Sequence, residues 1–375
     1  MPCMKKKSVK NEKDRIKVFS CEQPEEMFAF LKKRPVFKEL KYPYTEGMLK
    51  LLKETNPFRQ TYHYIESGES FAFFIIYESR MNIMTLGNSE WMMNVKTIGF
   101  PCSLSSSGYV TNDLEFLLSY CKKIKGGKLI LNVEEPVKVK GMGFGETLPS
   151  CVLPVKTEYS TIDEYVDELR SRYRRRIRLA KKSCSDVRVI REVVSGRPEN
   201  AVTVFSGKNT DIPNTAEKND EKTERWDIYP LYLNTYRKSE FKLECLDRKF
   251  FEESEGTRLI FVKDDKPAGF VLLHEEGEKL VFQFCGMDYE CMENTADLYF
   301  FMLLHIVGFA IEKKMKTIDF GQTSELTKMK FGAELSKRYF YAHHTNPFLN
   351  MFAILGKRLL EYRYDFPDFK VFRRG

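Results

Sequence analysis

The sequence predicts an α/β fold, a mixed β-sheet with flanking helices, and three observations support this prediction. Residues 257–334 have the composition of a hairpin, a third strand, a long apolar helix and a fourth strand. The same order of elements recurs in the first half of the chain. At 375 residues the chain is longer than one hydrophobic core usually grows, so two domains are expected.

Strand signals are clearest between residues 257 and 286. Two β-branched and aromatic runs flank the Asp-Asp-Lys-Pro turn at 264–267, which predicts a hairpin over 257–274. A third strand is predicted over 279–286, with the alternation of a buried sheet. Its two predicted faces carry Val281, Gln283 and Cys285 on one side, and Phe282 and Phe284 on the other.

A helix and a further strand follow this run. Residues 298–311 are apolar and of helical length, with Asn294 or Thr295 as N-cap, and the short β-rich run 317–321 ends in glycine. A strand, a long helix and a strand in this order imply a right-handed crossover between neighbouring strands of a mixed sheet. Polar residues beyond such a strand commonly carry ligands, so residues 322–334 are candidates.

The first half of the chain begins with two short amphipathic helices and then turns to strands. The helices are predicted over 25–33 and 45–54, separated by proline and turn signals. The later elements are strands at 71–77, 81–86 and 95–100, a helix at 113–124 and a strand at 128–133.

The two halves therefore repeat one pattern. Residues 71–86 correspond to 259–274, and the strand, helix and strand that follow agree in order and spacing. A repeat of about 180 residues is too long for a solenoid unit and predicts two copies of one α/β domain, over residues 1–160 and 161–375. The loop at 287–295 is more polar than its serine-rich counterpart at 101–107, so the reacting centre is expected in the second domain.

Composition disfavours several classes of protein. The nine cysteines include no Cys-x-x-Cys pair, which favours reduced thiols and a cytoplasmic location over disulfides or a zinc cage. The apolar run 298–311 is shorter than the roughly 20 residues that span a bilayer, so no transmembrane segment is expected. Neither a Ser-His-Asp arrangement nor a P-loop is apparent, and His343 and His344 have no third ligand at a metal spacing. The net charge of +8 permits a polyanionic partner without requiring one.

Residues 162–182 predict a helix with one apolar face and one strongly basic face. Like charges at this density repel one another by a few tenths of a kcal/mol per pair unless an anion offsets them. Phosphate on a nucleotide, a cofactor or RNA is one such anion. The alternative is a solvated helix between domains with acidic neighbours such as Asp163, Glu164, Asp167 and Glu168. The basic residues are Arg170, Arg172, Arg174, Arg175, Arg176, Arg178, Lys181 and Lys182.

The C-terminal tail is predicted to pack back onto the core. Residues 348–364 are amphipathic, and residues 366–372 are aromatic and basic. The helical spacing rests on Phe348, Phe352, Leu355 and Leu359.

The order of elements resembles the GNAT acyltransferase fold, and the tandem arrangement narrows that resemblance. The chain resembles the Fem family of peptidoglycan bridge aminoacyltransferases and related FemAB-like and BioF2-like acetyltransferase-domain proteins. The resemblance implies two tandem GNAT-like domains and acyltransferase activity. The segments that carry it are 174–182 (RRRIRLAKK), 267–269 (PAG), 318–321 (IDFG) and 328–332 (KMKFG).

The resemblance also bears on the reacting groups and the donor. In Fem enzymes a lysine three residues before a Phe-Gly pair lies near the reacting ester, and that position is Lys328 here. GNAT enzymes hold the CoA pyrophosphate with a Gln/Arg-x-x-Gly-x-Gly/Ala loop. That loop is missing after Phe284, where Gly286-Met-Asp-Tyr-Glu stands instead. The donor therefore stays open between acyl-CoA and aminoacyl-tRNA.

Four residues are candidate catalytic groups, each with a structural alternative. Lys328 would polarise a carbonyl or bind phosphate, and otherwise is a solvated lysine. Asp319 would position an amine or accept its proton, and otherwise caps neighbouring amides. Asp288 and Tyr289 would serve as base and as proton donor to the leaving group, and otherwise form a plain turn.

The predicted function is an N-acyltransferase in which an amine attacks the acyl group directly. No tightly bound cofactor is implied, and the acceptor is a small-molecule or peptide amine. Amides near residues 283–286 would stabilise the oxyanion. The alternative is a non-catalytic module that binds nucleotide or nucleic acid, such as tRNA, on a degenerate GNAT fold. Candidate donor-binding residues are Arg174, Arg175, Arg178, Lys181, Gln283, Cys285 and Gly286.

Overall fold

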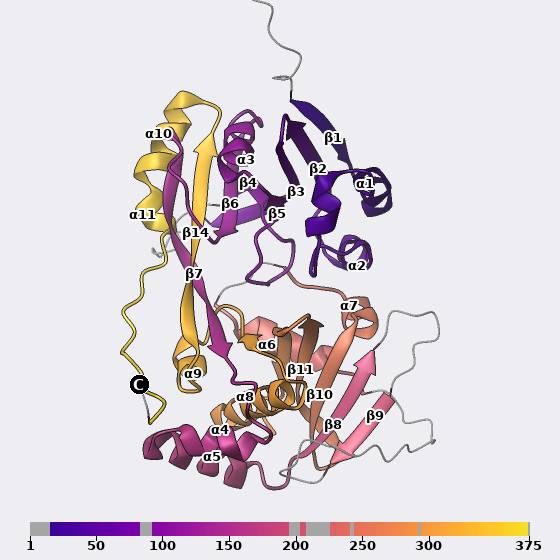
Figure 1. The fold of residues 1–375 in the computed structure, drawn as a ribbon, viewed down its shortest axis with the longest axis vertical. Coiled ribbons are helices and arrows are strands. Elements are labelled where there is room, and N and C mark those ends of the chain that lie inside the picture. Colours follow the sequence, from indigo (N-terminus) through magenta and orange to yellow (C-terminus); the bar gives the residue numbers. More distant parts are fainter. Residues whose placement is uncertain are drawn as a thin grey trace, which may run out of the picture.

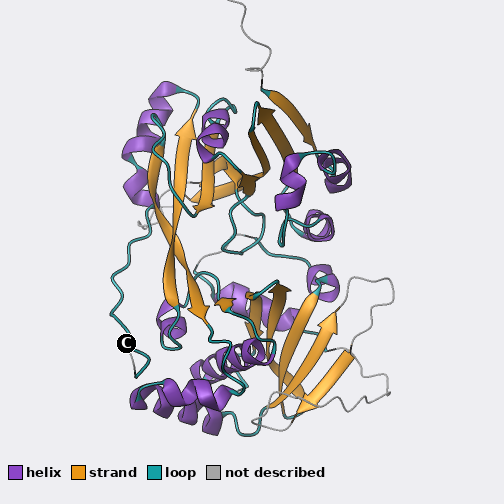
Figure 2. Cartoon of the chain, viewed as in Figure 1, coloured by secondary structure: helices purple, strands orange, loops and turns teal. Residues whose placement is uncertain are grey.

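A single mixed β-sheet runs through the protein. The computed structural model describes residues 16–82, 92–194, 203–207, 226–240, 244–291 and 294–373. Within these ranges fourteen strands join into one sheet, and helices cover both of its faces (Figures 1 and 2). The predicted α/β class with flanking helices is confirmed.

The first half builds its part of the sheet around a hairpin and a crossover helix. The two helices predicted near the amino end are present, and a short 3-10 turn follows the first of them. The elements are β1 (Lys17–Cys21), α1 (Pro24–Leu31), η2 (Pro35–Glu39), α2 (Glu46–Thr55), β2 (Gln60–Ser67), β3 (Ser70–Asn82), β4 (Met92–Ile98), β5 (Tyr109–Thr111), α3 (Leu114–Cys121) and β6 (Gly127–Val133).

The hairpin of the first half lies one strand earlier than predicted. Residues 70–82 form one continuous strand, and its hairpin partner is β2. The turn falls where Gly68 adopts a φ of +60°, a conformation that glycine takes without a steric penalty. Residues 78–80 carry no such turn former, and they stay extended in pairing with β4. The predicted hairpin over 71–86 is therefore wrong, and its last residues lie outside the described ranges.

The second half repeats this unit after four helices and two strands. The pairings β2-β3-β4-β6 are antiparallel, antiparallel and parallel, and β10-β11-β12-β13 have the same sequence of pairings. The elements are α4 (Ile162–Glu168), α5 (Ser171–Ser183), β8 (Arg188–Val194), β9 (Thr203–Gly207), α6 (Tyr229–Lys238), α7 (Arg248–Glu253), β10 (Gly256–Lys263), β11 (Lys266–Glu276), β12 (Lys279–Met287), α8 (Thr295–Glu312) and β13 (Thr317–Asp319).

The halves exchange their last strands. β7 (Gly143–Pro154), which follows the first unit, pairs antiparallel with β13 of the second. β14 (Glu334–His344), which follows the second unit, pairs antiparallel with β6 of the first. The two exchanged strands also pair with each other and lie side by side between the halves (Figure 1). The repeated strand order agrees with the tandem prediction, whereas the boundary near residue 160 stays a prediction.

Helix α8 is the centre of the second half's core. It packs with α4 and α5 against one face of β10 to β13, and α1, α2, α6 and α7 contribute to the core on the other face. Among the described residues, α8 is the one helix long and apolar enough to cross a membrane. Because 72% of its length is buried inside the protein, α8 has the burial of a core helix.

The predicted helix over 162–182 is two helices. Leu169 is extended between α4 and α5, and the backbone N–H of Arg170 donates to the carbonyl of Val371. The end of the tail therefore packs on the core as predicted, with Val371 buried.

The start of the tail does not pack as predicted. In α10 (Pro347–Leu355) no residue is buried, and Phe348, Phe352 and Leu355 are 63%, 55% and 69% exposed. The opposite side of the helix faces the protein, because the Asn350 amide bonds to the backbone of His344 and Gly141. A short helix, α11 (Lys357–Leu360), follows, and the side chain of Leu359 is outside the description.

Candidate active site

The parallel strands β12 and β13 separate after three residue pairs. They pair only over residues 279–281 and 317–319. Beyond that point the chain after β13 stays with β7, since Phe320 N–H donates to Cys151 O over 2.8 Å and Cys151 N–H donates to Gly321 O over 3.0 Å. Within the described residues, no strand pairs with this edge of β12 from Phe282 onward. The two strands thus open toward their carboxyl ends.

A β-bulge lies at Gln283, where the strands begin to part. Leu273 pairs with Phe282 and Leu272 with Phe284, so Gln283 is the extra residue. As a result Phe282 packs on the α8 side of the sheet and Phe284 on the opposite side. The predicted alternation, with both rings on one face, is wrong here because a bulge shifts the pattern by one residue.

The Gln283 amide reaches across to the first half. Its Nε2 donates to the Tyr42 hydroxyl, whose ring stacks on His274 with centroids 3.5 Å apart. Its Oε1 is buried and has no partner among the described residues. The predicted donor-binding residue Gln283 therefore has one buried acceptor without a partner among the described residues.

Lys328 is buried beneath the loop that follows β13. It lies on α9 (Glu325–Met329), is 2% exposed, and its Nζ donates to Gly321 O over 3.3 Å and to Gln322 O over 2.8 Å. Burial lowers the pKa of the Lys328 ammonium, and the nearby thiols and carboxylates oppose that shift. The solvated alternative is excluded by this burial.

The loop over Lys328 has a strained backbone. Thr323 and Ser324 adopt φ values of 63° and 53°, and Gly321 has a φ of 69°. Left-handed conformations are costly for residues with a side chain and gather at functional sites. Here they direct the carbonyls of Gly321 and Gln322 toward the Lys328 ammonium.

The Asp319 carboxylate accepts hydrogen bonds from three neighbours. It accepts from Ser105 Oγ over 2.8 Å, Ser150 Oγ over 2.6 Å and Gly321 N–H over 2.9 Å. This pattern matches the alternative of a strand-end carboxylate that caps neighbouring groups. Asp319 holds the loop and strand β7 in place around Lys328.

The serine-rich loop at 101–107 belongs to this region, although its composition had predicted no part in the reacting centre. Ser105 contacts Asp319, and Ser103 donates through its N–H and Oγ to the buried Glu244 carboxylate, at 2.8 and 3.0 Å. Burial raises the pKa of Glu244 to about 7. Through Ser105, the first half thus contacts Asp319 of the second.

Glu325 is a candidate that the sequence did not reveal. It is 6% exposed, its Oε1 has no partner among the described residues, and it precedes Lys328 by one helical turn. The Tyr362 hydroxyl, whose pKa is raised mainly by burial, hydrogen-bonds this carboxylate. No sequence pattern pointed to Glu325, because a glutamate just past a strand is usually solvated. The short helix α9 places its side chain inward.

The other candidates on β12 have mixed positions. Cys285 lies near Lys328: burial raises the pKa of its thiol to about 11, and the ammonium opposes that rise. Gly286 packs against α6, where an added Cβ would lie 2.5 Å from the backbone of Leu231 and Tyr232. Gly286 therefore serves close packing.

Asp288 and Tyr289 lie in the turn after β12. The Asp288 carboxylate accepts from Glu290 N–H over 2.9 Å, which fits the plain turn alternative. The Tyr289 hydroxyl lies 3.4 Å from Thr235 Oγ1, its ring lies 3.6 Å from the Lys238 ammonium, and burial raises its pKa.

The basic helix α5 divides its charges between internal partners and solvent. Arg174 pairs with Asp167 at 3.8 Å and Lys181 with Asp163 at 3.7 Å, as the acidic-neighbour alternative implies. Arg175 and Arg178 are exposed, and no ion pair involves them within the described residues. Lys182 is likewise exposed, and the exposed Arg172 donates to the Tyr173 hydroxyl, so α5 presents four exposed cations.

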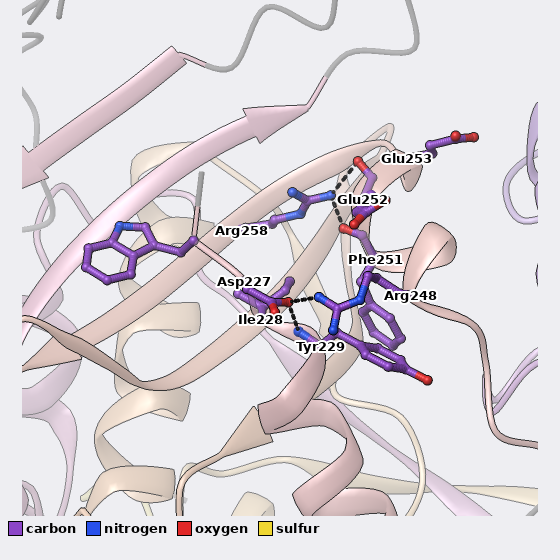
Figure 3. Close-up of a pocket in the computed structure, with 9 residues that line it drawn as sticks. Asp227, Ile228, Tyr229, Arg248, Phe251, Glu252, Glu253 and Arg258 are labelled. Atoms are coloured by element: carbon purple, nitrogen blue, oxygen red, sulfur yellow. Dashed lines mark hydrogen bonds and ion pairs between the residues drawn. The ribbon is translucent and has the colours of Figure 1, made fainter. Parts of the chain in front are cut away.

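A separate pocket of about 420 Å³ lies at the start of α6, between α7 and β10 (Figure 3). Arg258 there donates to the carbonyls of Phe251 and Glu252 and lies 3.7 Å from Glu192. Arg248 pairs with Asp227. Because internal partners take up both guanidinium groups, the pocket offers no clear ligand charge. Its lining residues are Trp226, Asp227, Ile228, Tyr229, Arg248, Phe251, Glu252, Glu253 and Arg258.

Comparisons with known proteins bear on the fold. No family model matches the sequence, and no curated protein does. Among solved structures, L-PGS from Bacillus licheniformis superposes with a TM-score of 0.50 at 11% identity, over 91% of this chain and 98% of that one. FemX gives 0.43 at 13% identity, over 89% and 100%. A GCN5-related N-acetyltransferase from Sphaerobacter thermophilus gives 0.28 at 10% identity, over 76% and 80%.

The mixed sheet with flanking helices, and the parting of β12 and β13, define a GNAT-like α/β fold. More particularly, it shares the overall fold of L-PGS along nearly its whole length. At 11% identity this likeness concerns the fold, so activity has to be argued from the residues of this chain.

Proposed function

We propose that the protein is an N-acyltransferase that transfers an acyl or aminoacyl group to an amine. The observation that carries the proposal is a buried ammonium, Lys328, beside a buried carboxylate with a free oxygen, Glu325, where β12 and β13 part. An acid and a base in a water-poor site are what direct attack by an amine requires.

In the proposed reaction the amine nitrogen attacks the acyl carbon, and the C–N bond forms as the C–O or C–S bond of the donor breaks. Negative charge develops on the carbonyl oxygen and then on the leaving atom. The Lys328 ammonium stabilises that charge strongly because little water screens it. The proton lost by the amine passes to Glu325, and the Glu325 carboxyl then donates it to the leaving oxygen or sulfur, which returns Glu325 to its ionised form. No covalent enzyme intermediate is needed.

Glu325→Gln is expected to lower kcat about 100- to 1,000-fold, within the usual range for a lost general base, with little change in thermal stability. The amide keeps the shape of the side chain and cannot accept the proton. Initial rates with the active donor, measured beside thermal unfolding, test this. Glu334→Gln is the matched control, because Glu334 is exposed at the start of β14. Equal rates for the two variants would contradict a role for Glu325 as base.

The donor is acyl-CoA or aminoacyl-tRNA, both of which carry phosphate. Arg175 and Arg178, two of the exposed cations of α5, would contact it. The chain lacks the glycine-rich loop with which GNAT enzymes hold a pyrophosphate, which favours a donor bound through side chains. A small-molecule or peptide amine is the proposed acceptor.

A panel of CoA thioesters and charged tRNAs, offered with simple amines and analysed by mass spectrometry, tests the proposal. Acyl transfer from a member of either set is expected, and Arg175→Ala/Arg178→Ala should weaken donor binding about tenfold at low salt, where screening is least. Arg59→Ala is the control, an exposed arginine on the first half. Tight binding of tRNA or CoA with no product from any pair would favour the non-catalytic module instead.

A further inference from the structure

Helix α10 exposes an unusually large apolar surface. Half of the strongly exposed large hydrophobic residues in the described chain lie on this one nine-residue helix. At 100° per residue, most of them form one broad stripe. The exposed residues are Phe348, Leu349, Met351, Phe352 and Leu355.

The helix is fixed in this orientation. The Asn346 side chain caps its first turn by accepting from Phe348 N–H and Leu349 N–H. Asn350 Oδ1 accepts from His344 N–H and its Nδ2 donates to Gly141 O, both over 2.9 Å. α10 lies beside β14 on the outside of the sheet (Figure 1). Its apolar stripe therefore points away from the protein as a built feature.

Cationic segments lie next to α10. Three segments are tied to α10 or to the residues just before and after it: 122–127 through Thr345 and Gly126, 138–141 through Asn350 and Gly141, and 357–358 by direct continuation. They contain no acidic residue. Within the described residues none of their cations forms an ion pair. This cationic rim consists of Lys122, Lys123, Lys125, Lys138, Lys140, Lys357 and Arg358.

We propose that α10 and its cationic rim dock the protein on the surface of an anionic lipid bilayer. Phenylalanine, leucine and methionine tips would enter the boundary between headgroups and acyl chains, and the rim would lie against the negative headgroups. The helix lies on the membrane and does not span it.

The charges favour a bilayer over a second copy of the chain. A twofold contact through α10 would bring two sets of seven cations face to face. In addition, a helix about 14 Å long covers far less than the roughly 800 Å² per partner of a stable dimer. An extended anionic surface satisfies both the stripe and the rim.

The test is co-sedimentation of the full chain with vesicles of phosphatidylcholine alone and with about 30% phosphatidylglycerol. The protein is expected to bind the anionic vesicles, and to bind the neutral vesicles at least about tenfold more weakly. Salt should weaken binding to the anionic vesicles. Phe348→Ser/Phe352→Ser/Leu355→Ser should reduce binding at least about tenfold. Val18→Ser/Phe37→Ser is the matched control, two exposed apolar residues on the other side of the first half, and should bind as wild type.

A second readout uses insertion. Phe352→Trp should give a blue-shifted emission on anionic vesicles relative to the background of the native tryptophans. Three results would overturn the proposal. The first two are the absence of vesicle binding and vesicle binding that the triple serine variant retains. The third is a protein that binds no vesicles and forms, in sedimentation velocity, a dimer that the triple variant abolishes. All substituted residues are exposed, and unchanged thermal unfolding confirms that each variant is folded.

Discussion

Lys328→Met is expected to lower kcat about 100- to 1,000-fold, corresponding to the 2.7–4 kcal/mol associated with one oxyanion donor. Methionine preserves the apolar stem in its buried position and removes the ammonium. Because the carbonyls of Gly321 and Gln322 lose their donor, unfolding free energy should fall by about 1–3 kcal/mol, which leaves the protein folded. Rates with the active donor and calorimetry on the same samples provide the measurement.

Lys330→Met is the internal control. Lys330 has the same charge two residues further along, at the end of α9, and it is partly exposed. Burial lowers the pKa of Lys328, so the active ammonium of the wild type should be lost at a pH below the ordinary lysine value of 10.5. The wild-type rate should fall as pH rises through that lowered pKa, and this alkaline limb should be absent in Lys328→Met. Equal small losses in both variants would remove Lys328 from the mechanism.

Separating the chain at residue 160 is expected to leave both fragments unfolded. Fragment 1–160 keeps β7 and lacks β14, so the edge of β6 loses its neighbour. Fragment 161–375 keeps β14 and lacks β7, so β13 loses its own. Circular dichroism and amide hydrogen exchange of each purified fragment test this expectation.

Co-expression of the two fragments should restore a soluble, folded complex, because every strand pairing is then available again. This is the control that separates a missing strand from a damaged chain. Cooperative unfolding of either fragment alone would show that the strand exchange is dispensable, and that residues 1–160 or 161–375 form an autonomous domain.

The sequence predicted the repeated unit because local composition determines its elements. The helix around Leu298 and the strand around Ile318 were expected from apolar runs and caps, and both are present. The partners of β7 and β14 were not predictable, since strand pairing across about 190 residues leaves no local pattern. The hairpin of the first half was predicted at the wrong position, because runs of β-branched residues indicate strands and do not indicate where the turn between them lies.

In the candidate site, Lys328 was identified from its position in the Fem-like motif. The burial and hydrogen bonds of Lys328 could not be predicted from the hydrophobic periodicity of the sequence. A bulge at Gln283 shifts which side chains share a face, and composition does not signal it. Glu325 becomes notable only when α9 turns it inward. Apolar residues at the spacing seen on α10 usually form the side of a helix that packs on the core. Here that side faces outward, because Asn350 on the other side of the helix bonds to the protein.

The strand exchange also has a consequence during synthesis on the ribosome. The edge of β6 is complete once residue 133 has emerged, whereas β14 begins at residue 334. At roughly 5–20 residues per second, the nascent chain would carry that open edge for about 10–40 seconds. An unpaired strand edge is a template for aggregation. Chaperones are therefore expected to bind the nascent first half. The yield of folded protein should depend on the speed of translation of the second half.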